Sequence, residues 1–399
     1  MVTNTRIALL HDSLNSCGGA ERLTLAFARA LKELGHSVDL FVFEPTLWEK
    51  IETLTSINHD VIDHEYILFP VKDLLSLRTL YNKFLLWFLR DIIGVHMVRS
   101  RNYDLTITTK QILVPVFTDI LYLHFPNFII EYYYLYYPDK SNSTLYRIYL
   151  QPLELLLKPL LLLFRSLEHK PLILTNSRFS ALAIKKFLGV NCLVLYPPIE
   201  LEKYLPLSRN IERKNLVVTL SRIEPLKNIE IILDIAKEIK TAKFIIAGTI
   251  GSIEYYSTLK REIKTLGLEE RVKILPNVEE EAKMMMLKIS KIYLHPMKYE
   301  HFGIAIVEAM ASGLIPVVHK SGGAWIDIVE YGKYGFGFRR IDEAVEYINS
   351  ILEMNESELQ NWRSKLFEKV KLFSYDAFKN NIEHLIKALS EFKNKAIER

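Results

Sequence analysis

Two glutamates eight positions apart are the first residues in this 399-residue chain whose spacing suggests chemistry. Glu300 and Glu308 lie in the segment YEHFGIAIVEAM, residues 299–310. We expect a helix to begin near Phe302 and Gly303, with Glu300 in the loop before it and Glu308 in its second turn. The free N–H groups of a helix start favour an anion, and a glycine lets a ligand approach the backbone closely. A carboxylate would repel the anion itself, but it accepts hydrogen bonds from hydroxyl groups. We therefore expect Glu300 to bind sugar hydroxyls and Glu308 to bind the diol of a ribose.

Cations and glycines at other expected strand ends could complete this anion site. Arg222 and Lys227 lie in SRIEPLKN after an apolar strand, where two cations suit a diphosphate. Gly322 and Gly323 follow the strand LIPVVH, where a backbone turn could approach a phosphate or a sugar. Taken singly, SRIEPLKN also fits a solvated charged loop, and the segment with Gly322 and Gly323 also fits an ordinary turn. The segment with Glu300 and Glu308 also fits a helix with surface glutamates.

The first half of the chain contributes weaker candidates. Gly18 and Gly19 precede an expected helix and could bring N–H groups to a phosphate, although their segment is not G-x-G-x-x-G. His124 ends the aromatic strand YLHFP and could orient a sugar hydroxyl or be a hydrogen-bonded core histidine. The sequence has no D-x-D dyad and no clustered His and Cys set, so we expect no bound metal and no cofactor.

The elements that position these residues alternate between strand and helix. Residues 6–12, 18–36 and 37–43 read as strand, helix and strand, which predicts a parallel sheet. After a polar linker at 201–213 the same pattern restarts, and helices are expected at 356–370 and 375–392. Two doubly wound α/β domains in tandem bind ligands at the carboxyl ends of their strands.

Composition limits the classes of protein that fit. A chain of 399 residues is too long for one ordinary core, and a net charge of +4 gives no argument for nucleic acid. Cys17 and Cys192 have no paired spacing, which suits a reducing compartment. The first residues lack the pattern of a signal peptide, and charges and prolines interrupt the leucine-rich stretch 150–164, so we expect no membrane span.

The stretch 71–101 is basic and amphipathic, with six lysines and arginines against two aspartates. Such a segment suits an anionic membrane surface, and the tyrosines at 129–138 favour an interface. We therefore expect a peripheral membrane contact through the N-terminal domain. A helical insertion that folds onto its own core is the alternative.

Taken together, these motifs resemble those of the retaining glycosyltransferases of family 4. The resemblance rests on the E-x₇-E pair, on EAMASGLIPVVHKSGG after it and on Arg222 and Lys227 before it, and it covers nearly the whole chain. With YLHFP and VLYPPIE, the segment 300–329 is similar to dolichol-pathway α-1,2-mannosyltransferases and related enzymes that use GDP-mannose. Ala324 departs from that subgroup, which usually has proline after the glycine pair.

The resemblance implies the GT-B fold, an α/β architecture with two Rossmann-like domains facing each other across a cleft. It implies an acceptor domain at 1–200 with a membrane-facing insertion at about 71–165, a nucleotide-sugar domain at 201–375 and a final helix at 376–399 returning to the first domain. The implied reaction is metal-independent hexosyl transfer with retention, most simply of mannose from GDP-mannose, with UDP-glucose as the alternative donor. The implied acceptor is a polyprenyl-linked oligosaccharide or another glycan, at the cytoplasmic face of a membrane.

The resemblance also assigns roles to residues. Glu300 and the backbone of Phe302, Gly303 and Ile304 would contact the donor sugar, and Glu308 would bind the ribose. The leaving diphosphate would be neutralised by the two cations, Gly18 and Gly19 would supply amides, and His124 would sit at the reacting sugar. Gly322 and Gly323 would belong to the donor site as well. A nucleotide-sugar epimerase of GT-B fold and a non-catalytic nucleotide-sugar-binding protein remain as alternatives. The epimerase would leave the apolar and basic N-terminal domain unexplained, and the joint presence of both glutamates and both cations argues against a non-catalytic protein.

Overall fold

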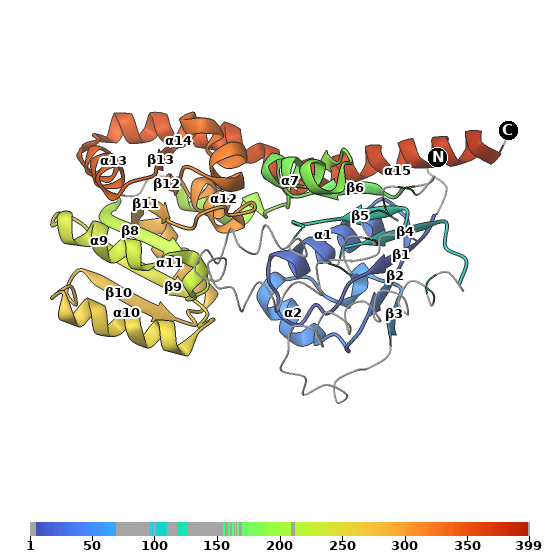
Figure 1. Cartoon of the computed structure of the whole chain (residues 1–399), viewed down its shortest axis with the longest axis horizontal. Helices are drawn as coiled ribbons and strands as arrows, with labels where there is room; N and C mark the ends of the chain where they lie inside the picture. The colour runs from blue at the N-terminus through green and yellow to red at the C-terminus, as the bar shows by residue number, and fades with distance from the viewer. Residues whose placement is uncertain are drawn as a thin grey trace. The chain divides into compact units, whose positions relative to one another are not determined.

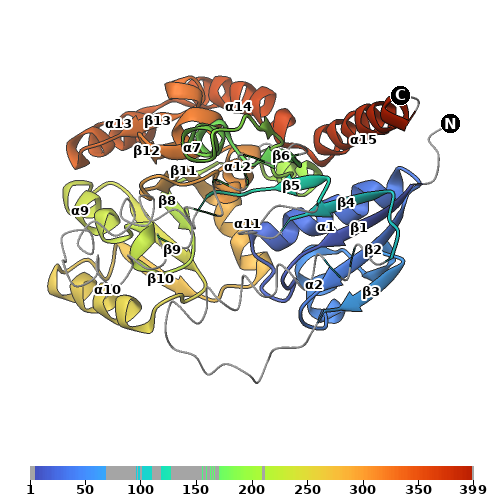
Figure 2. The same cartoon turned by 45° about the vertical axis from the view of Figure 1, so that its right-hand side comes forward.

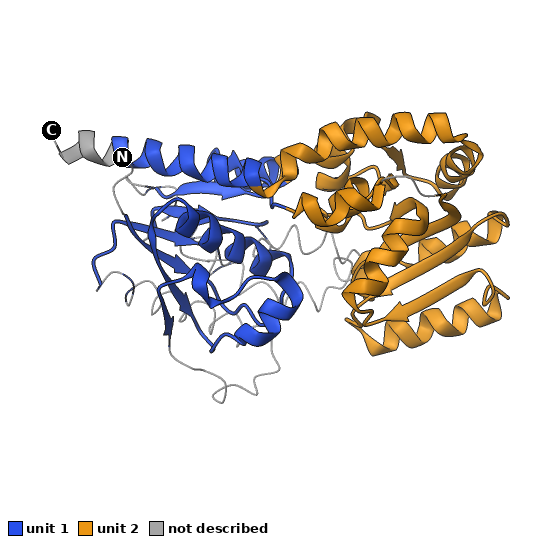
Figure 3. Ribbon diagram, turned by 180° about the vertical axis from the view of Figure 1, so that it is seen from behind, with its two compact units in different colours: residues 1–176, 180–198, 376–399 blue, residues 177–179, 199–375 orange. Residues whose placement is uncertain are grey.

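A computed structural model describes residues 5–68, 96, 98, 101–109, 118–126, 155, 159, 162, 164, 166, 170–208 and 212–397. The chain divides into two compact units, drawn in two colours in Figure 3. The N-terminal unit comprises residues 1–176, 180–198 and 376–399, and the C-terminal unit comprises 177–179 and 199–375. The expected insertion at about 71–165 lies largely outside the described residues.

The N-terminal unit is built on a parallel sheet in the order β3-β2-β1-β4-β5-β6-β7 (Figure 1). Its strands are β1 (Arg6–Leu10), β2 (Ser37–Val42), β3 (His64–Ile67), β4 (Leu105–Thr108), β5 (Ile120–Tyr122), β6 (Leu172–Thr175) and β7 (Leu193–Val194). The central strands are buried on both faces, which their continuous apolar runs predict. The strand order reverses after β1, so the sheet is doubly wound, as we expected.

The helices of this unit whose bounds lie in the described residues are α1 (Gly19–Glu33), α2 (Trp48–Thr55), α7 (Arg178–Leu188) and α15 (Tyr375–Ile397). Phe27 of α1 packs edge-on against Tyr122 of β5 and against Phe378 of α15. Lys379 of α15 also forms an ion pair with Glu33 of α1. The final helix of the chain therefore packs on the N-terminal unit, as the fold predicted from the sequence requires.

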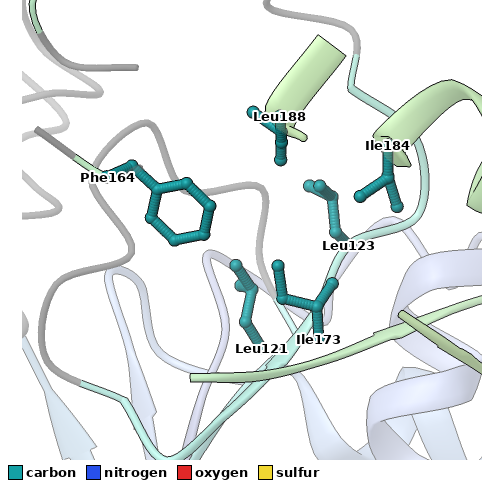
Figure 4. Close-up of a cluster of buried hydrophobic side chains, with 6 residues drawn as sticks. All are labelled: Leu121, Leu123, Phe164, Ile173, Ile184 and Leu188. Carbon is teal, nitrogen blue, oxygen red and sulfur yellow. The ribbon is translucent and has the colours of Figure 1, made fainter. Parts of the chain in front are cut away.

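A second part of the core in this unit lies between β5, β6 and α7 (Figure 4). Leu121 and Leu123 face Ile173, and the helix contributes Ile184 and Leu188. Phe164, one of the few described residues between 127 and 169, points into the same cluster and is almost completely buried. At least this residue of the leucine-rich stretch 150–164 therefore belongs to the protein core.

The C-terminal unit repeats the architecture with a parallel sheet in the order β10-β9-β8-β11-β12-β13 (Figure 2). Its strands are β8 (Lys214–Leu220), β9 (Lys243–Gly248), β10 (Val272–Pro276), β11 (Ser290–His295), β12 (Ile315–His319) and β13 (Phe336–Phe338). Its α-helices are α8 (Leu201–Tyr204), α9 (Glu230–Glu238), α10 (Ile253–Thr265), α11 (Glu280–Ile289), α12 (Ile304–Ala311), α13 (Ile341–Glu353) and α14 (Glu356–Val370). Four short 3₁₀ turns, η2 (Leu205–Ser208), η3 (Pro225–Lys227), η5 (Glu330–Gly332) and η6 (Lys371–Phe373), lie between some of these elements.

The sequence analysis missed several elements. It left out α2 and β3 in the first unit and β13 and α13 in the second, and the stretch 201–213 predicted as a linker contains the short helix α8 and the turn η2. The strand β13 has three residues, too few to show an alternating pattern. The helix α13 does have helical spacing, with Ala344, Ile348 and Ile351 buried on one face, so its omission was an error of interpretation.

Candidate active site

The loop between β11 and α12 positions Glu300 at the carboxyl end of a central strand. The strand ends at His295, and Tyr299 takes a left-handed conformation with φ 56°, which turns the chain back towards the sheet. Parallel strands end at the same edge, so β8 delivers Lys227 to the same place through η3. The sequence places these two residues 73 positions apart, and the fold brings their side chains into contact.

Glu300 and Lys227 form a largely buried ion pair. The Lys227 Nζ lies 2.9 Å from the Glu300 Oε2, and the two side chains are only 16% and 14% exposed. The His295 Nε2 lies 3.1 Å from the same carboxylate oxygen. Burial of Glu300 would raise its pKa, but Lys227 and His295 outweigh this and hold the pKa well below its usual value. The carboxylate therefore stays ionised at neutral pH.

The N-terminus of α12 lies directly beside Glu300. Gly303 caps the helix at φ 104°, a conformation that disfavours any side chain, and Ile304 begins the helix. A Cβ at position 303 would also come within 2.6 Å of a side-chain carbon of Ile306. Phe302 is buried against Phe373, with ring centroids 5.5 Å apart. The first N–H groups of α12 are thus held rigidly at this edge of the sheet, where an anion is favoured.

Glu308 occupies a different, more enclosed environment on α12. Its side chain is 6% exposed and forms an ion pair with the Lys283 Nζ at 2.9 Å. The Tyr204 hydroxyl donates a hydrogen bond of 2.8 Å to the other carboxylate oxygen. The Lys283 ammonium also donates to the Tyr204 hydroxyl at 3.1 Å, which closes a triangle of three groups. Each predicted glutamate is therefore held by its own lysine.

Gly322 and Gly323 pack underneath the Glu300 loop. A Cβ at Gly322 would lie 2.4 Å from the Glu300 carbonyl oxygen, and one at Gly323 would lie 2.1 Å from that of His301. The N–H of Gly323 donates to the Glu300 carbonyl at 2.7 Å. The two glycines thus allow the backbone of the loop that carries Glu300 to pack closely against them. The prediction from the sequence did not include this structural role.

Arg222 is the most exposed of the predicted cations. Its guanidinium pairs with Glu224 at 3.1 Å, and its side chain is 65% exposed. It lies just after β8, at the same sheet edge as Lys227. An exposed guanidinium on a flexible stem can reorient towards an incoming anion at little cost.

The remaining predicted residues belong to the N-terminal unit. Gly18 is the N-cap of α1 and Gly19 its first residue, and the side chain of Glu21 covers Gly18 closely enough to meet a Cβ there at 2.8 Å. Burial would raise the pKa of Glu21, but hydrogen bonds from His11, its own backbone and Ser16 lower it to about 2. His124 follows β5, is half-buried and lies edge-on to Tyr122. The roles of these residues stay predictions.

The sequence analysis did not identify three residues of the site. His295 ends the strand β11, whose mostly apolar run KIYL is visible in the sequence, so its position at the carboxyl end could have marked it as a partner of Glu300. Tyr204 and Lys283 come from α8 and α11, and no local motif connects either of them to Glu308. Among the described residues there is no group of three or more His, Cys, Asp or Glu side chains placed to hold a metal ion.

The folds of solved proteins identify the class of the chain. A sucrose-phosphate synthase from Thermosynechococcus elongatus superposes with a TM-score of 0.74 at 15% identity, covering 97% of this chain and all of that one. WaaG, a glycosyltransferase involved in lipopolysaccharide biosynthesis, gives a TM-score of 0.70 at 13% identity, covering 95% and 99%. At such low identity the likeness concerns the fold alone. The chain has the GT-B fold of glycosyltransferases, with two Rossmann-like units, as predicted.

A family model matches most of the C-terminal unit. Residues 206–369 match the family described as "Glycosyl transferases group 1". This match over part of the chain confirms the resemblance to glycosyltransferases noted from the E-x₇-E segment.

Curated relatives extend the match beyond these residues. "GDP-Man:Man(3)GlcNAc(2)-PP-Dol alpha-1,2-mannosyltransferase" of Dictyostelium discoideum is 28% identical over 51% of this chain and 44% of its own length. "Alpha-1,3/1,6-mannosyltransferase ALG2" of the same organism is 24% identical over 96% of this chain and 98% of its own length. The chain thus spans less than half of the first relative and nearly all of the second. The family match and these relatives support glycosyltransferase activity.

Proposed function

We propose that the chain transfers a mannosyl residue from GDP-mannose to a lipid-linked oligosaccharide, with retention of the anomeric configuration. The observation that carries the proposal is the ionised Glu300 held beside Lys227 at the start of α12, within the residues that match the group 1 glycosyltransferase family. The relatives named as mannosyltransferases support the choice of donor and acceptor. The proposal includes the donor site Arg222, Lys227, Glu300, Glu308 and the backbone from Phe302 to Ile304.

The proposed donor site separates the charges of the reaction. Breaking a bond between a sugar and a diphosphate leaves negative charge on the diphosphate and positive charge near the anomeric carbon. Lys227, Arg222 and the N–H groups of α12 would stabilise the departing diphosphate, in the way that preorganised donors stabilise developing charge in other enzymes. Glu300 would accept hydrogen bonds from sugar hydroxyls, because an ionised carboxylate only accepts.

Glu308 would bind the ribose of the nucleotide. Its carboxylate is fixed in orientation by Lys283 and Tyr204, so little rotamer freedom would be lost when a diol binds. A carboxylate oxygen can accept two hydrogen bonds, so a ribose hydroxyl could bind to an oxygen that also contacts Lys283 or Tyr204.

The acceptor side of the proposal rests on the N-terminal unit. Gly18 and Gly19 would offer amides to the donor phosphates, Gly322 and Gly323 would do so from the other unit, and His124 would orient the reacting hydroxyl. The basic amphipathic segment 71–101 would hold the protein on the cytoplasmic face of a membrane, near a polyprenyl-linked acceptor. No helix among the described residues is long and apolar enough to cross a bilayer.

Nucleotide release tests the proposal most directly. The purified full chain is incubated with GDP-mannose or UDP-glucose, with and without a polyprenyl-diphosphate oligosaccharide, and free nucleotide is measured. We expect release from GDP-mannose that depends on the acceptor, and an α-linked product by NMR. Release of nucleotide without the acceptor would favour an epimerase or a hydrolase. Binding of the nucleotide sugar without release of nucleotide would favour a non-catalytic protein. Turnover of UDP-glucose alone would refute the assignment of mannose.

Matched variants test the proposed residues. Lys227→Ala should lower kcat by about 10²–10³-fold, the usual effect of removing one group that stabilises developing charge. Lys237→Ala is its control, since Lys237 lies on α9 of the same unit with a side chain 41% exposed. Glu300→Gln should also abolish most transfer, and Glu346→Gln on the exposed face of α13 should not. Equal activity of Lys227→Ala and Lys237→Ala would refute the assigned site.

A further inference from the structure

The turn that carries Glu300 is supported by two residues that the proposed function does not use. Tyr299, the residue before Glu300, takes a left-handed conformation with φ 56°. A residue with a side chain rarely adopts this conformation, so the surrounding structure must hold the turn in place. That support comes from the end of β12 and the residues after it, where His319 and Ser321 lie two positions apart.

The segment after β12 holds the chain on both sides of Glu300. The Ser321 Oγ accepts a hydrogen bond of 2.8 Å from the Tyr299 N–H, just before the glutamate. The Gly323 N–H donates to the Glu300 carbonyl at 2.7 Å, just after the Cα of the glutamate. Because the glutamate side chain leaves the backbone between these two bonds, they set the direction from which its carboxylate reaches Lys227.

His319 fixes the hydroxyl that receives the Tyr299 N–H. The His319 Nδ1 lies 2.7 Å from the Ser321 Oγ, which restricts the rotation of the serine side chain. The Ser321 N–H also donates to the His319 carbonyl at 2.7 Å, so a backbone bond and a side-chain bond join the same two residues. A serine hydroxyl has one hydrogen and two lone pairs, so it can bind the imidazole and accept the Tyr299 N–H at the same time.

The imidazole of His319 has a defined position and a defined charge. Its ring lies edge-on to Phe338, with ring centroids 5.8 Å apart. Burial and two neighbouring cations, Lys298 and Arg339, lower the pKa of His319 to about 4. The ring is therefore neutral at pH 7. In the tautomer with hydrogen on Nε2, Nδ1 accepts the hydrogen of the Ser321 hydroxyl, and both lone pairs of the hydroxyl stay available as acceptors.

We propose that Ser321 and His319 are positioning residues that orient the Glu300 carboxylate for the transfer reaction. This role rests on the proposed function, in which the carboxylate binds hydroxyls of the donor sugar. His319 acts through Ser321, and Ser321 acts through the backbone of Tyr299, so neither residue needs to touch the substrate. Loss of either side chain should consequently impair turnover without weakening the binding of the nucleotide.

Hydrogen exchange tests the network without an assay of activity. Exchange of the Tyr299 N–H in the full chain is followed by mass spectrometry with fragmentation to single residues. In Ser321→Ala this N–H loses its acceptor and should exchange about tenfold faster. Ser290→Ala is the matched control, because it removes a fully buried hydroxyl that donates to the Met286 carbonyl at the amino end of β11. Exchange that is unchanged in Ser321→Ala, or equally faster in both variants, would overturn the inference.

Transfer kinetics separate positioning from binding. Ser321→Ala should lower kcat about 10–100-fold, the scale on which a misplaced catalytic group acts, with the Kd for GDP within about threefold of the wild type. Ser321→Thr keeps the hydroxyl and should retain kcat within about threefold, as should the control Ser290→Ala. A loss of GDP affinity as large as the loss of kcat would make Ser321 a direct ligand of the nucleotide and overturn the inference. An equal loss of kcat in Ser290→Ala would reduce its role to stability and would also overturn it.

Two substitutions at position 319 test the second member of the pair. His319→Asn keeps a polar atom near the place of Nδ1 and should retain most of the activity. His319→Phe removes that atom and should lower kcat about as much as Ser321→Ala. Normal turnover in His319→Phe would refute the role of the histidine. A wild type that shows the expected exchange difference but transfers no mannose would refute the proposed function, and with it the role in transfer, while the network around Tyr299 would stand.

Discussion

The Glu300–Lys227 ion pair should show strong energetic coupling in a double-mutant cycle. The cycle compares Lys227→Met, Glu300→Gln and the double variant with the wild type. At 2.9 Å and an effective dielectric constant of about 20, two unit charges attract by about 6 kcal/mol, before the cost of desolvating them. Both side chains are about 85% covered, so we expect desolvation to cancel more than half of this attraction.

Each single substitution should therefore destabilise the unit by about 2–3 kcal/mol, slightly below the range for fully buried pairs. The double variant should lose less than the sum of the two, with a coupling energy of about 1–3 kcal/mol. Urea unfolding followed by tryptophan fluorescence measures these values, since Trp325 and Trp362 belong to the same unit. Additive losses, with a coupling energy below about 0.5 kcal/mol, would refute the buried pair.

The same pair predicts a pH dependence of stability. The folded pKa of Glu300 lies well below its unfolded value, so the carboxylate stabilises the fold above about pH 4.5. That contribution is lost as the pH falls through the lower, folded pKa. The stability difference between wild type and Lys227→Met should consequently shrink between about pH 5 and pH 3. A difference that stays constant over this range would contradict the assignment of Lys227 as a cause of the low pKa.

Three further outcomes follow from the site. Gly323→Ala should lower the free energy of unfolding by about 2–4 kcal/mol, because its Cβ would meet a backbone carbonyl at 2.1 Å. Gly267→Ala, at a position with φ 64° and open space, should lower it by only about 1–2 kcal/mol. Equal losses in urea unfolding would contradict this prediction. Lys283→Met removes the cation paired with the buried Glu308 and should lower the free energy of unfolding by about 3 kcal/mol. Tyr204→Phe removes only a hydrogen bond and should lower it by about 1–2 kcal/mol. The reverse order would be inconsistent with these contacts. Protein treated with EDTA should keep its full transfer rate, and a rate that returns only when Mg²⁺ or Mn²⁺ is added would show that cations of the chain do not suffice.

The sequence predicted the central features of the fold because they are local. The first βαβ pattern and its repetition after residue 213 predict two parallel sheets, and both are present. The position of Glu300 before a helix and of Glu308 within it also follows from local signals, namely an apolar strand, a glycine and an apolar run. Short elements such as β13 lie below the length at which periodicity is informative.

The partners of the two glutamates could be predicted only in part. Lys227 follows β8 and Glu300 follows β11, and adjacent parallel strands end at one edge, so topology alone places them together. Tyr204 and Lys283 reach Glu308 from the short helix α8, inside the predicted linker 201–213, and from α11, and neither position is fixed by a strand end. Their contacts depend on how these helices pack on α12, which the spacing of residues along the chain does not encode.

The partners of Glu300 and Glu308 differ, so Lys227 and Lys283 should respond differently when a nucleotide sugar binds. The Lys227 ammonium is 16% exposed and shares its carboxylate with His295, so a diphosphate can draw it away while the histidine continues to hold Glu300. Glu308 is 6% exposed, and its lysine is also held by the Tyr204 hydroxyl, so drawing Lys283 away would break its ion pair with a buried carboxylate. Under the proposed function, Lys227 is therefore the cation that can change partner during the reaction. Lys283 fixes the second carboxylate in place and should affect nucleotide affinity much more than turnover.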